Sequence, residues 1–287
     1  AFVRECIDAN LVLETPDPVI DTQFRYAKLR AAESIVATKG GYMHAPGGES
    51  YYAAIWANDQ AEYVNPFFPF LGYGVGNASA LNSFRHFARF MNPAYEPLPS
   101  SVIAEGDDIW NGAGDRGDAA MIACGAARYA LARGDRAEAA ELWPLVEWCL
   151  EYCRRQLTAD GVVASDTDEL EGRFPTGDAN LCTSTLYYDA LLSAVSLGRE
   201  LGVESAQTAR FAKEGRQLLS CGGGIIKRGE NLRALHQNGV VLFLDRPLDA
   251  LTVGGGRPLS SSTEALKKME AERRPLYLAA ADAVIPN

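Results

Sequence analysis

Apolar side chains recur through residues 1–205 at the spacing of helices that bury one face. Leu81, Phe84, Ala88 and Met91, for example, fall on a single stripe. The spacing predicts six helices with no convincing strand between them, at Asp21–Thr38, Tyr51–Tyr63, Gly76–Met91, Asp115–Ala132, Glu138–Leu157 and Asn180–Leu201. We therefore expect a mainly α region that is built of stacked helical hairpins.

Turn residues mark where the first two of these helices are expected to end. Gly40–Gly41 follows the first helix, and Asn65–Pro66 follows the second. Both pairs are typical of helix ends. The first helix is therefore predicted to run to Thr38, and the second to stop near Tyr63.

The pattern changes after Ser205. Val240–Asp245 and Ala283–Ile285 are continuous apolar runs, and such runs are typical of parallel strands that are buried on both faces. Helices are expected around them near Thr208–Gln217 and at Glu230–His236 and Ser262–Glu272. The sequence thus predicts two parts: helical hairpins over residues 1–205, and an incomplete α/β segment over residues 206–287.

Composition narrows the class of protein. The chain is 47% hydrophobic and 22% charged, and no apolar run approaches the roughly 18–20 residues of a membrane span, so we expect no membrane association. The N-terminus lacks the basic and apolar regions of a signal peptide. The six cysteines lie mostly in apolar helical patterns without a CxxC pair or a Cys/His cluster. We therefore expect reduced buried thiols, no metal, no cofactor and a cytoplasmic protein.

The charge is unevenly distributed between the two parts. Residues 1–205 carry 15 Lys and Arg against 29 Asp and Glu, whereas residues 206–287 carry 12 against 8. The acidic part argues against binding of nucleic acid, and the second part is too weakly basic to argue for it. A change of sign within one chain indicates two pieces with different partners.

The connection between the fifth and sixth predicted helices is long and acidic. A helical hairpin needs about 2–8 residues for such a turn. From Asp166 onward this one contains five carboxylates, namely Asp166, Asp168, Glu169, Glu171 and Asp178. One interpretation is a solvated acidic loop. The other is a loop that holds an acid for chemistry on a neutral, hydroxyl-rich substrate.

Three stretches together resemble a six-hairpin glycosidase: Tyr51–Tyr63, Trp110–Asp118 and the acidic loop. This superfamily of (α/α)6 barrels includes glucoamylases, trehalases and glycogen-debranching enzymes. The resemblance implies a carbohydrate ligand, bound by Trp56, Asp59, Trp110, Asp115 and Arg116. Trp56 and Asp59 match the ends of a Trp-Pro-Arg-Asp segment that grips sugar hydroxyls, although the two central residues differ here. For Trp56 and Trp110, packing in the core is the alternative to sugar binding.

By the same resemblance, the general acid of a glycosidase lies in the acidic loop. Glu171 is the first candidate, with Glu169 and Asp168 as alternatives, because local spacing does not determine the register. Hydrolysis with inversion also needs a second carboxylate about 6.5–9.5 Å away. In the superfamily this base comes from the last hairpins, and residues 1–205 supply only about half a barrel. No base is recognisable, so a second chain that completes the barrel is a possible partner.

Residues 206–287 strongly resemble the C-terminal half of a shikimate kinase. The matching pieces occur in order at Ser220–Gly224, Asn238–Asp245, Gly256–Leu259 and Arg273–Tyr277. The resemblance implies that Gly222, Gly223, Gly224 and Arg274 hold shikimate, and that Arg257 lies on a lid over the ATP phosphates. Glycine permits close approach of the backbone to a ligand, and guanidinium groups suit carboxylate and phosphate. A tight turn and surface arginines are the alternative.

The chain has no G-x-x-x-x-G-K-[ST] sequence, so nothing is recognisable that would cradle the β- and γ-phosphates of ATP. In the kinase family the strand before that loop lies between strands represented here by Leu218–Cys221 and Val240–Leu244. We therefore expect no kinase activity. Three hypotheses remain: a glycoside hydrolase present as a partial barrel, an inactive shikimate kinase fragment, or a chimeric, truncated or designed chain with little activity of its own.

Overall fold

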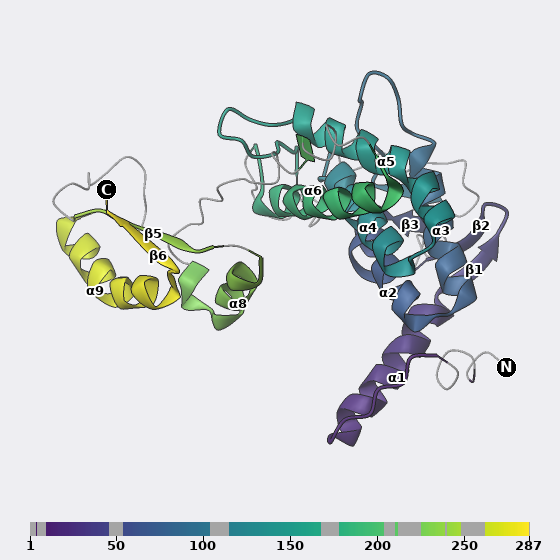
Figure 1. Cartoon of the computed structure of the whole chain (residues 1–287), viewed down its shortest axis with the longest axis horizontal. Helices are drawn as coiled ribbons and strands as arrows, with labels where there is room; N and C mark the ends of the chain where they lie inside the picture. The colour runs from purple at the N-terminus through teal and green to yellow at the C-terminus, as the bar shows by residue number, and fades with distance from the viewer. Residues whose placement is uncertain are drawn as a thin grey trace. The chain divides into compact units, whose positions relative to one another are not determined.

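The structure is a computed structural model that describes residues 4, 10–45, 54–103, 115–167, 178–203, 210–211, 225–238, 240–247 and 262–286. The chain forms two compact units, Ala1–Gln217 (unit 1) and Leu218–Asn287 (unit 2) (Figure 1). The described residues are mainly helical, as the sequence predicted. The expected boundary near Ser205 falls within residues 204–209, which are outside the described part, and stays a prediction.

A central helix organises unit 1. α4 (Asp118–Arg133) packs against both α5 (Arg136–Arg155) and α6 (Leu181–Leu201) (Figure 1). The contact can be close because many buried residues of α4 are small, namely Ala119, Ala120, Ala123, Ala126, Ala127 and Ala130. Alanine also has the highest helix propensity. These three helices confirm the last three helical predictions for this region.

Polar caps and glycines set the ends of these helices. The Asp135 carboxylate accepts hydrogen bonds from the backbone N–H groups of Ala137 and Glu138, at 2.8 and 3.0 Å, and so begins α5. Gly134, with φ 66°, ends α4, and Gly202, with φ 75°, ends α6. Glycine adopts this left-handed conformation without the steric penalty of a side chain.

The first helix is shorter than predicted. α1 spans Pro18–Glu33, and β1 (Ile35–Thr38) then pairs antiparallel with β2 (Gly41–His44). The prediction of one helix to Thr38 without a strand was wrong. β-branched residues favour the strand, and the glycines that were expected to stop a helix instead turn a hairpin, in which Gly41 has φ 99°.

A second strand pair corrects the next prediction. Ala54–Trp56 forms β3, antiparallel to β4 (Ser101–Ile103), where a helix over Tyr51–Tyr63 was expected. A π-helix, η3 (Asp59–Val64), follows. The aromatic-rich segment alternates too briefly to separate a strand from a helix by periodicity, and pairing with a strand far along the chain decides between them.

Asn65–Pro66 begins a helix rather than ending one. α2 spans Asn65–Leu71 and has its proline in the first turn, where a missing N–H leaves no internal hydrogen bond unmade. α3 (Gly74–Ala88) follows and confirms the helix that was predicted at Gly76–Met91. Among the helices of the described ranges, none is long and apolar enough to cross a membrane.

Unit 2 contains an α/β segment, as the sequence predicted. It consists of η4 (Ile225–Lys227), α8 (Gly229–Asn238), β5 (Leu242–Asp245), α9 (Thr263–Ala280) and β6 (Ala283–Pro286). β5 and β6 are parallel neighbours, and α9 connects them in the chain. This is the arrangement expected from parallel strands, which need a long crossover.

The strands of unit 2 are not buried on both faces, which corrects the prediction. Phe243 stacks on Tyr277 of α9, with ring centres 5.1 Å apart, so α9 covers one face of the pair. Leu242 and Leu244 point the other way and are 41% and 57% exposed. Apolar runs identified the strands correctly, but the described residues of this unit leave the second face in solvent.

Candidate functional site

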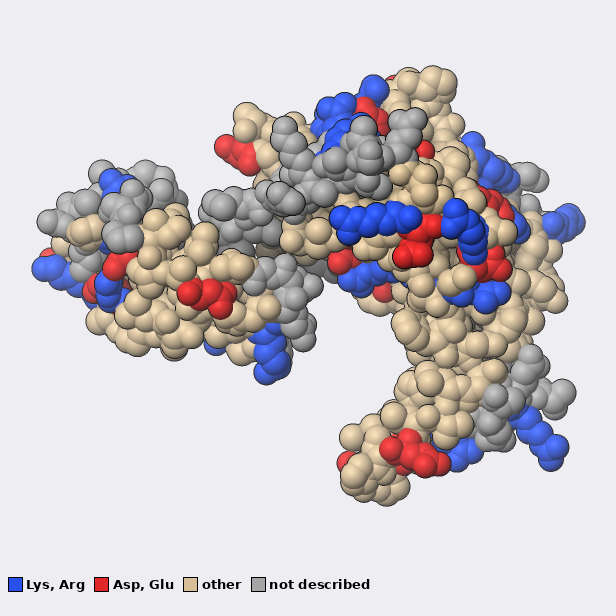
Figure 2. Space-filling view, in the orientation of Figure 1, with Lys and Arg blue, Asp and Glu red and all other residues tan. Residues whose placement is uncertain are grey.

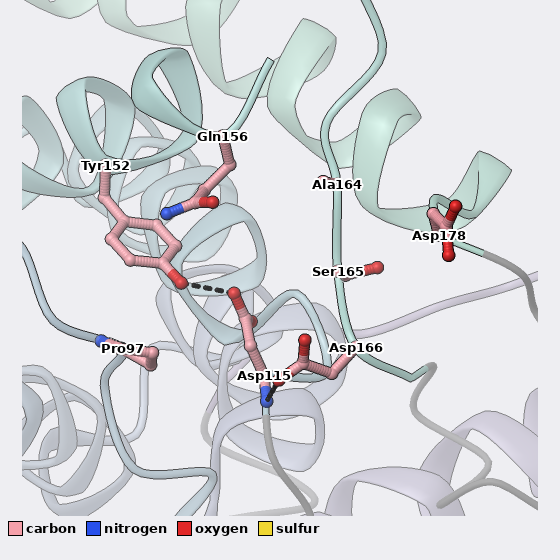
Figure 3. Close-up of a pocket in the computed structure, with 8 residues that line it drawn as sticks. All are labelled: Pro97, Asp115, Tyr152, Gln156, Ala164, Ser165, Asp166 and Asp178. Carbon is pink, nitrogen blue, oxygen red and sulfur yellow. Dashed lines mark hydrogen bonds between the residues drawn. The ribbon is translucent and has the colours of Figure 1, made fainter. Parts of the chain in front are cut away.

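A polar cleft opens in unit 1 where the end of α5 meets the acidic loop (Figure 3). Its volume is about 450 Å³. It is lined by Pro97, Asp115, Tyr152, Gln156, Ala164, Ser165, Asp166 and Asp178. These residues come from the segment before β4, the residues before α4, the last turns of α5, and the loop between α5 and α6.

Backbone hydrogen bonds join the acidic loop to the segment before α4. The N–H groups of Asp166 and Thr167 donate to the carbonyl oxygen of Asp115, at 2.9 and 3.2 Å. In return, the Asp115 N–H donates to Oδ2 of Asp166 at 3.3 Å. Two stretches that the sequence analysis singled out separately therefore meet at one wall of the cleft.

Asn180 ties the same loop to the start of α6. Its Oδ1 accepts from the Thr183 N–H at 2.8 Å and so caps the helix. Its Nδ2 donates to Oγ of Ser165 at 2.7 Å and to the carbonyl of Thr167 at 3.3 Å. One side chain thus positions both the helix and the cleft wall.

The Asp115 carboxylate is buried at the base of the cleft and held on both sides. The Tyr152 hydroxyl donates to its Oδ2 (Figure 3), and the Gly117 N–H donates to its Oδ1 at 2.9 Å. Burial raises the pKa of Asp115, and the neighbouring Asp166 raises it further, whereas the two hydrogen bonds oppose this shift. The outcome is an oriented carboxyl group whose pKa lies above its ordinary value.

Stacked aromatic rings hold Tyr152 in place. Its ring lies 5.7 Å from that of Trp148, which lies 5.2 Å from that of Tyr95, and both pairs are stacked. Arg155 covers Tyr95, with its guanidinium carbon 3.9 Å from the ring centre. The Trp148 indole N–H donates to the carbonyl of Asn92 at 3.0 Å. Trp148 therefore packs as part of the scaffold that supports Tyr152.

Arg116 faces away from the cleft although it follows Asp115 in the chain. Its side chain is 2% exposed and lies over Trp56 of β3, with the guanidinium carbon 5.8 Å from the ring centre. Its Nε donates to Oγ of Ser100 at 3.1 Å, and the same hydroxyl donates to Asp118 at 2.9 Å. The structure brings these residues together in a buried polar cluster.

The predicted site residues fall into three groups. Asp115 lines the cleft, whereas Trp56, Arg116 and Asp59, the first residue of η3, do not. Arg274 lies in unit 2, where its guanidinium donates to both oxygens of Asp245, at 2.6 and 2.5 Å. Eight predicted residues lie outside the described part of the chain: Trp110, Asp168, Glu169, Glu171, Gly222, Gly223, Gly224 and Arg257.

Sequence reasoning missed Tyr152 and Gln156. Both lie in a stretch whose apolar spacing identified it only as a helix: Tyr152 is in the last turn of α5, and Gln156, four residues later, is the C-cap of that helix. The sequence did contain a signal for them, because Tyr152 and Gln156 form a polar pair just before the acidic loop. Within the described residues, no group of three or more His, Cys, Asp and Glu side chains is arranged to hold a metal ion.

Comparison with known proteins finds matches in sequence and a match in structure. The family model of shikimate kinase matches residues 202–287. The shikimate kinase of Clostridium beijerinckii is 39% identical over 88 residues, which are 29% of this chain and 52% of that protein. That of Dehalococcoides mccartyi is 33% identical over 106 residues, 33% of this chain and 60% of that protein. This chain thus spans about half the length of the curated relatives it matches.

Among solved structures, a glycoside hydrolase from family 105 of C. acetobutylicum ATCC 824 aligns over 92% of this chain and 74% of its own. The TM-score is 0.49, and the sequences are 13% identical. Residues 202–287 are thus similar to about half of a shikimate kinase, the family that residues 206–287 resembled in the sequence.

Proposed function

We propose that unit 1 binds carbohydrate in the cleft and acts as a glycoside hydrolase-type protein. The observation that carries this proposal is the meeting of Asp115 with the acidic loop at one wall of a cleft of about 450 Å³. Hydroxyl-rich ligands need closely spaced hydrogen-bond acceptors and donors. Tyr152, Gln156 and Ser165 line the cleft beside the carboxylates and supply both.

We assign Asp115 as the general base, which was not recognisable from the sequence. A base must be ionised and aimed, and the donors on its two oxygens favour both conditions. A raised pKa also strengthens it, because a general base works best when its pKa approaches the working pH. In an inverting reaction, Asp115 would remove a proton from water as that water attacks the anomeric carbon.

The proton donor in this proposal comes from the acidic loop. Glu171 stays the first candidate, with Glu169 and Asp168 as the alternatives, and all three lie outside the described residues. The described residues on either side of them support this choice: the Thr167 N–H donates to the carbonyl of Asp115, and Asp178 lines the cleft.

The test is a hydrolysis screen of the whole chain against oligosaccharides of differing sugar and linkage, with release of reducing ends as the readout. For any substrate that is cut, Asp115→Asn and Glu171→Gln should each lower the rate by about 100-fold or more, the usual loss for general acid or base catalysis. Asp160→Asn is the matched control, because Asp160 is exposed and does not line the cleft.

Full hydrolysis by Asp115→Asn would overturn the assignment of the base. Absence of cleavage together with absence of sugar binding would overturn the proposal as a whole. Tryptophan fluorescence measures binding in parallel, since all four tryptophans of the chain precede residue 218 and so belong to unit 1.

A second candidate function belongs to unit 2, a segment of a shikimate kinase. The match over residues 202–287 favours it. The chain spans about half of such a kinase and contains no phosphate-binding G-x-x-x-x-G-K-[ST] sequence. Arg274, assigned by resemblance to shikimate, forms a two-point ion pair with Asp245. We therefore propose a kinase-derived segment without phosphoryl transfer of its own.

A further inference from the structure

The cleft of unit 1 is lined by charges of one sign. Asp115, Asp166 and Asp178 line it, and its other lining residues are uncharged. Among the described residues that line the cleft, none is a lysine, arginine or histidine. A ligand there therefore meets the negative potential of three carboxylates.

The arginines next to the lining residues in the chain are directed elsewhere. Arg116 follows Asp115, but its guanidinium is buried over Trp56. Arg155 precedes Gln156, but it lies on the ring of Tyr95 and pairs with Glu151, with Nε 2.9 Å from Oε1. Neither of these two cations lines the cleft. The charges of the described cleft lining are all negative, whereas on the face of unit 1 drawn in Figure 2 acidic and basic side chains are interspersed.

The segments that adjoin the cleft in sequence are acidic as well. Residues 104–114, which end at Asp115, contain three Asp and Glu and no Lys or Arg. Residues 168–177, between Thr167 and Asp178, contain three Asp and Glu and one Arg. The described residues next to these segments are hydrogen-bonded: the Thr167 N–H donates to the carbonyl of Asp115, and the Ser165 N–H donates to the carbonyl of Asp178 at 3.2 Å. The sequence next to the lining residues is therefore predominantly acidic.

We infer that the cleft selects sugars by charge: amino sugars bind most tightly, neutral sugars next, and uronates least. The inference rests on the proposed carbohydrate-binding function and adds a substrate class to it. A uronate brings a carboxylate toward three others, and the described lining residues include no cation to pair with it. The protonated amino group of an amino sugar is attracted by these carboxylates and forms charge-assisted hydrogen bonds with them.

The experiment uses the whole chain and methyl glycosides of gluco, galacto and manno configuration, each as a neutral, a 2-amino and a uronate form. Binding is measured by NMR titration at low salt and neutral pH. In each configuration that binds, the amino form should be bound more tightly than the neutral form, and the uronate more weakly. Each step should be about three- to ten-fold, and it should shrink when salt is added.

Charge-removing variants locate the effect. Asp166→Asn and Asp178→Asn should each reduce the ratio of amino to uronate affinity by about three-fold or more. Asp160→Asn removes the same charge from the same loop outside the cleft lining and should leave the ratio unchanged.

Uronates that bind as tightly as neutral sugars would overturn the inference while leaving the proposed glycoside hydrolase function standing. Equal ratios in wild type and Asp166→Asn would also overturn it. If none of the nine glycosides binds, both the inference and the carbohydrate-binding proposal fail.

Discussion

Asp115 and Arg116 are neighbours in the sequence but occupy different environments. The tight turn at Gly117, whose φ is 87°, returns its N–H to Asp115 and lets the two side chains diverge. Asp115 lines the cleft, and Arg116 enters the core beside Ser100 and Asp118. A side chain at Gly117 would collide with Thr183, since an added Cβ would lie 2.3 Å from its Oγ1.

Asp118 gives unit 1 a pH dependence of stability at the residue scale. Burial raises the pKa of Asp118 to about 6, against the partial compensation of Arg116 and Ser100. The folded state therefore retains the proton when the unfolded chain has lost it. Stability should fall as the pH rises from about 4 to about 6, by up to about 3 kcal/mol from this group.

Asp118→Asn should remove that fall, because the amide carries no charge to desolvate. Urea unfolding of both proteins, followed by tryptophan fluorescence between pH 4 and pH 7, measures the difference. Burial lowers the pKa of His44 to about 4, which makes its contribution rise with pH. Subtracting the two proteins cancels that opposite trend. A difference that stays constant with pH would contradict the prediction.

At the scale of elements, α4 and η3 approach each other closely in unit 1. Gly125 lies in the middle of α4, directly against the backbone of Ala61. An added Cβ would lie 2.4 Å from the Ala61 carbonyl oxygen and 2.6 Å from its Cα. Neither atom belongs to a flexible side chain, so the two elements would have to separate.

Gly125→Ala should therefore destabilise unit 1 by about 1–3 kcal/mol, the usual cost of overpacking, although alanine is the better helix former. Gly74→Ala is the matched control. Gly74 begins α3 and has nothing within 4 Å of an added Cβ. The midpoint of urea unfolding distinguishes them, and equal midpoints for the two variants would show that the helices accommodate the methyl group.

The predictions at this scale were uneven for a physical reason. α4, α5 and α6 follow local signals, namely helical apolar spacing with Asp135, Asn180 and glycines at the ends. The strands β1 to β4 depend on pairing, in part with segments far along the chain. Trp56, for example, pairs with Ser101. Local spacing does not contain that information.

At the scale of the whole molecule, the chain joins two units of different kinds. Unit 1 has an extensive core of buried apolar side chains, whereas unit 2 leaves Leu242, Leu244, Val284 and Ile285 more than two-fifths exposed. Such strands in a complete α/β domain are covered on both faces. The exposure agrees with a segment that spans about half of the matching kinases.

This organisation predicts that the chain alone does not phosphorylate shikimate. A coupled assay of ADP release with ATP, magnesium and shikimate should give the same rate with and without shikimate. The physical reason is the lack of a glycine-rich loop and lysine to hold the transferred phosphate. Release that depends on shikimate, and that disappears in Arg257→Ala, would prove this prediction wrong.

The sequence by itself determined the helical class of unit 1, the α/β character of unit 2 and the resemblance of its C-terminal residues to shikimate kinases. Periodicity, caps and ordered motifs are local, so they can be read without coordinates. It also identified Asp115 and the acidic loop as parts of one resemblance to a glycosidase, but not the contacts between them.

Only the tertiary structure decided that Asp115, Tyr152 and Asp166 share a cleft while Arg116 turns into the core. These relations depend on hydrogen bonds between residues about 50 positions apart in the chain, such as Asp115 and Asp166, which are 51 apart. Side-chain direction at a tight turn is likewise set by packing on both sides. The negative charge of the described cleft lining follows from the fold, because the fold directs Arg116 and Arg155 away from the cleft.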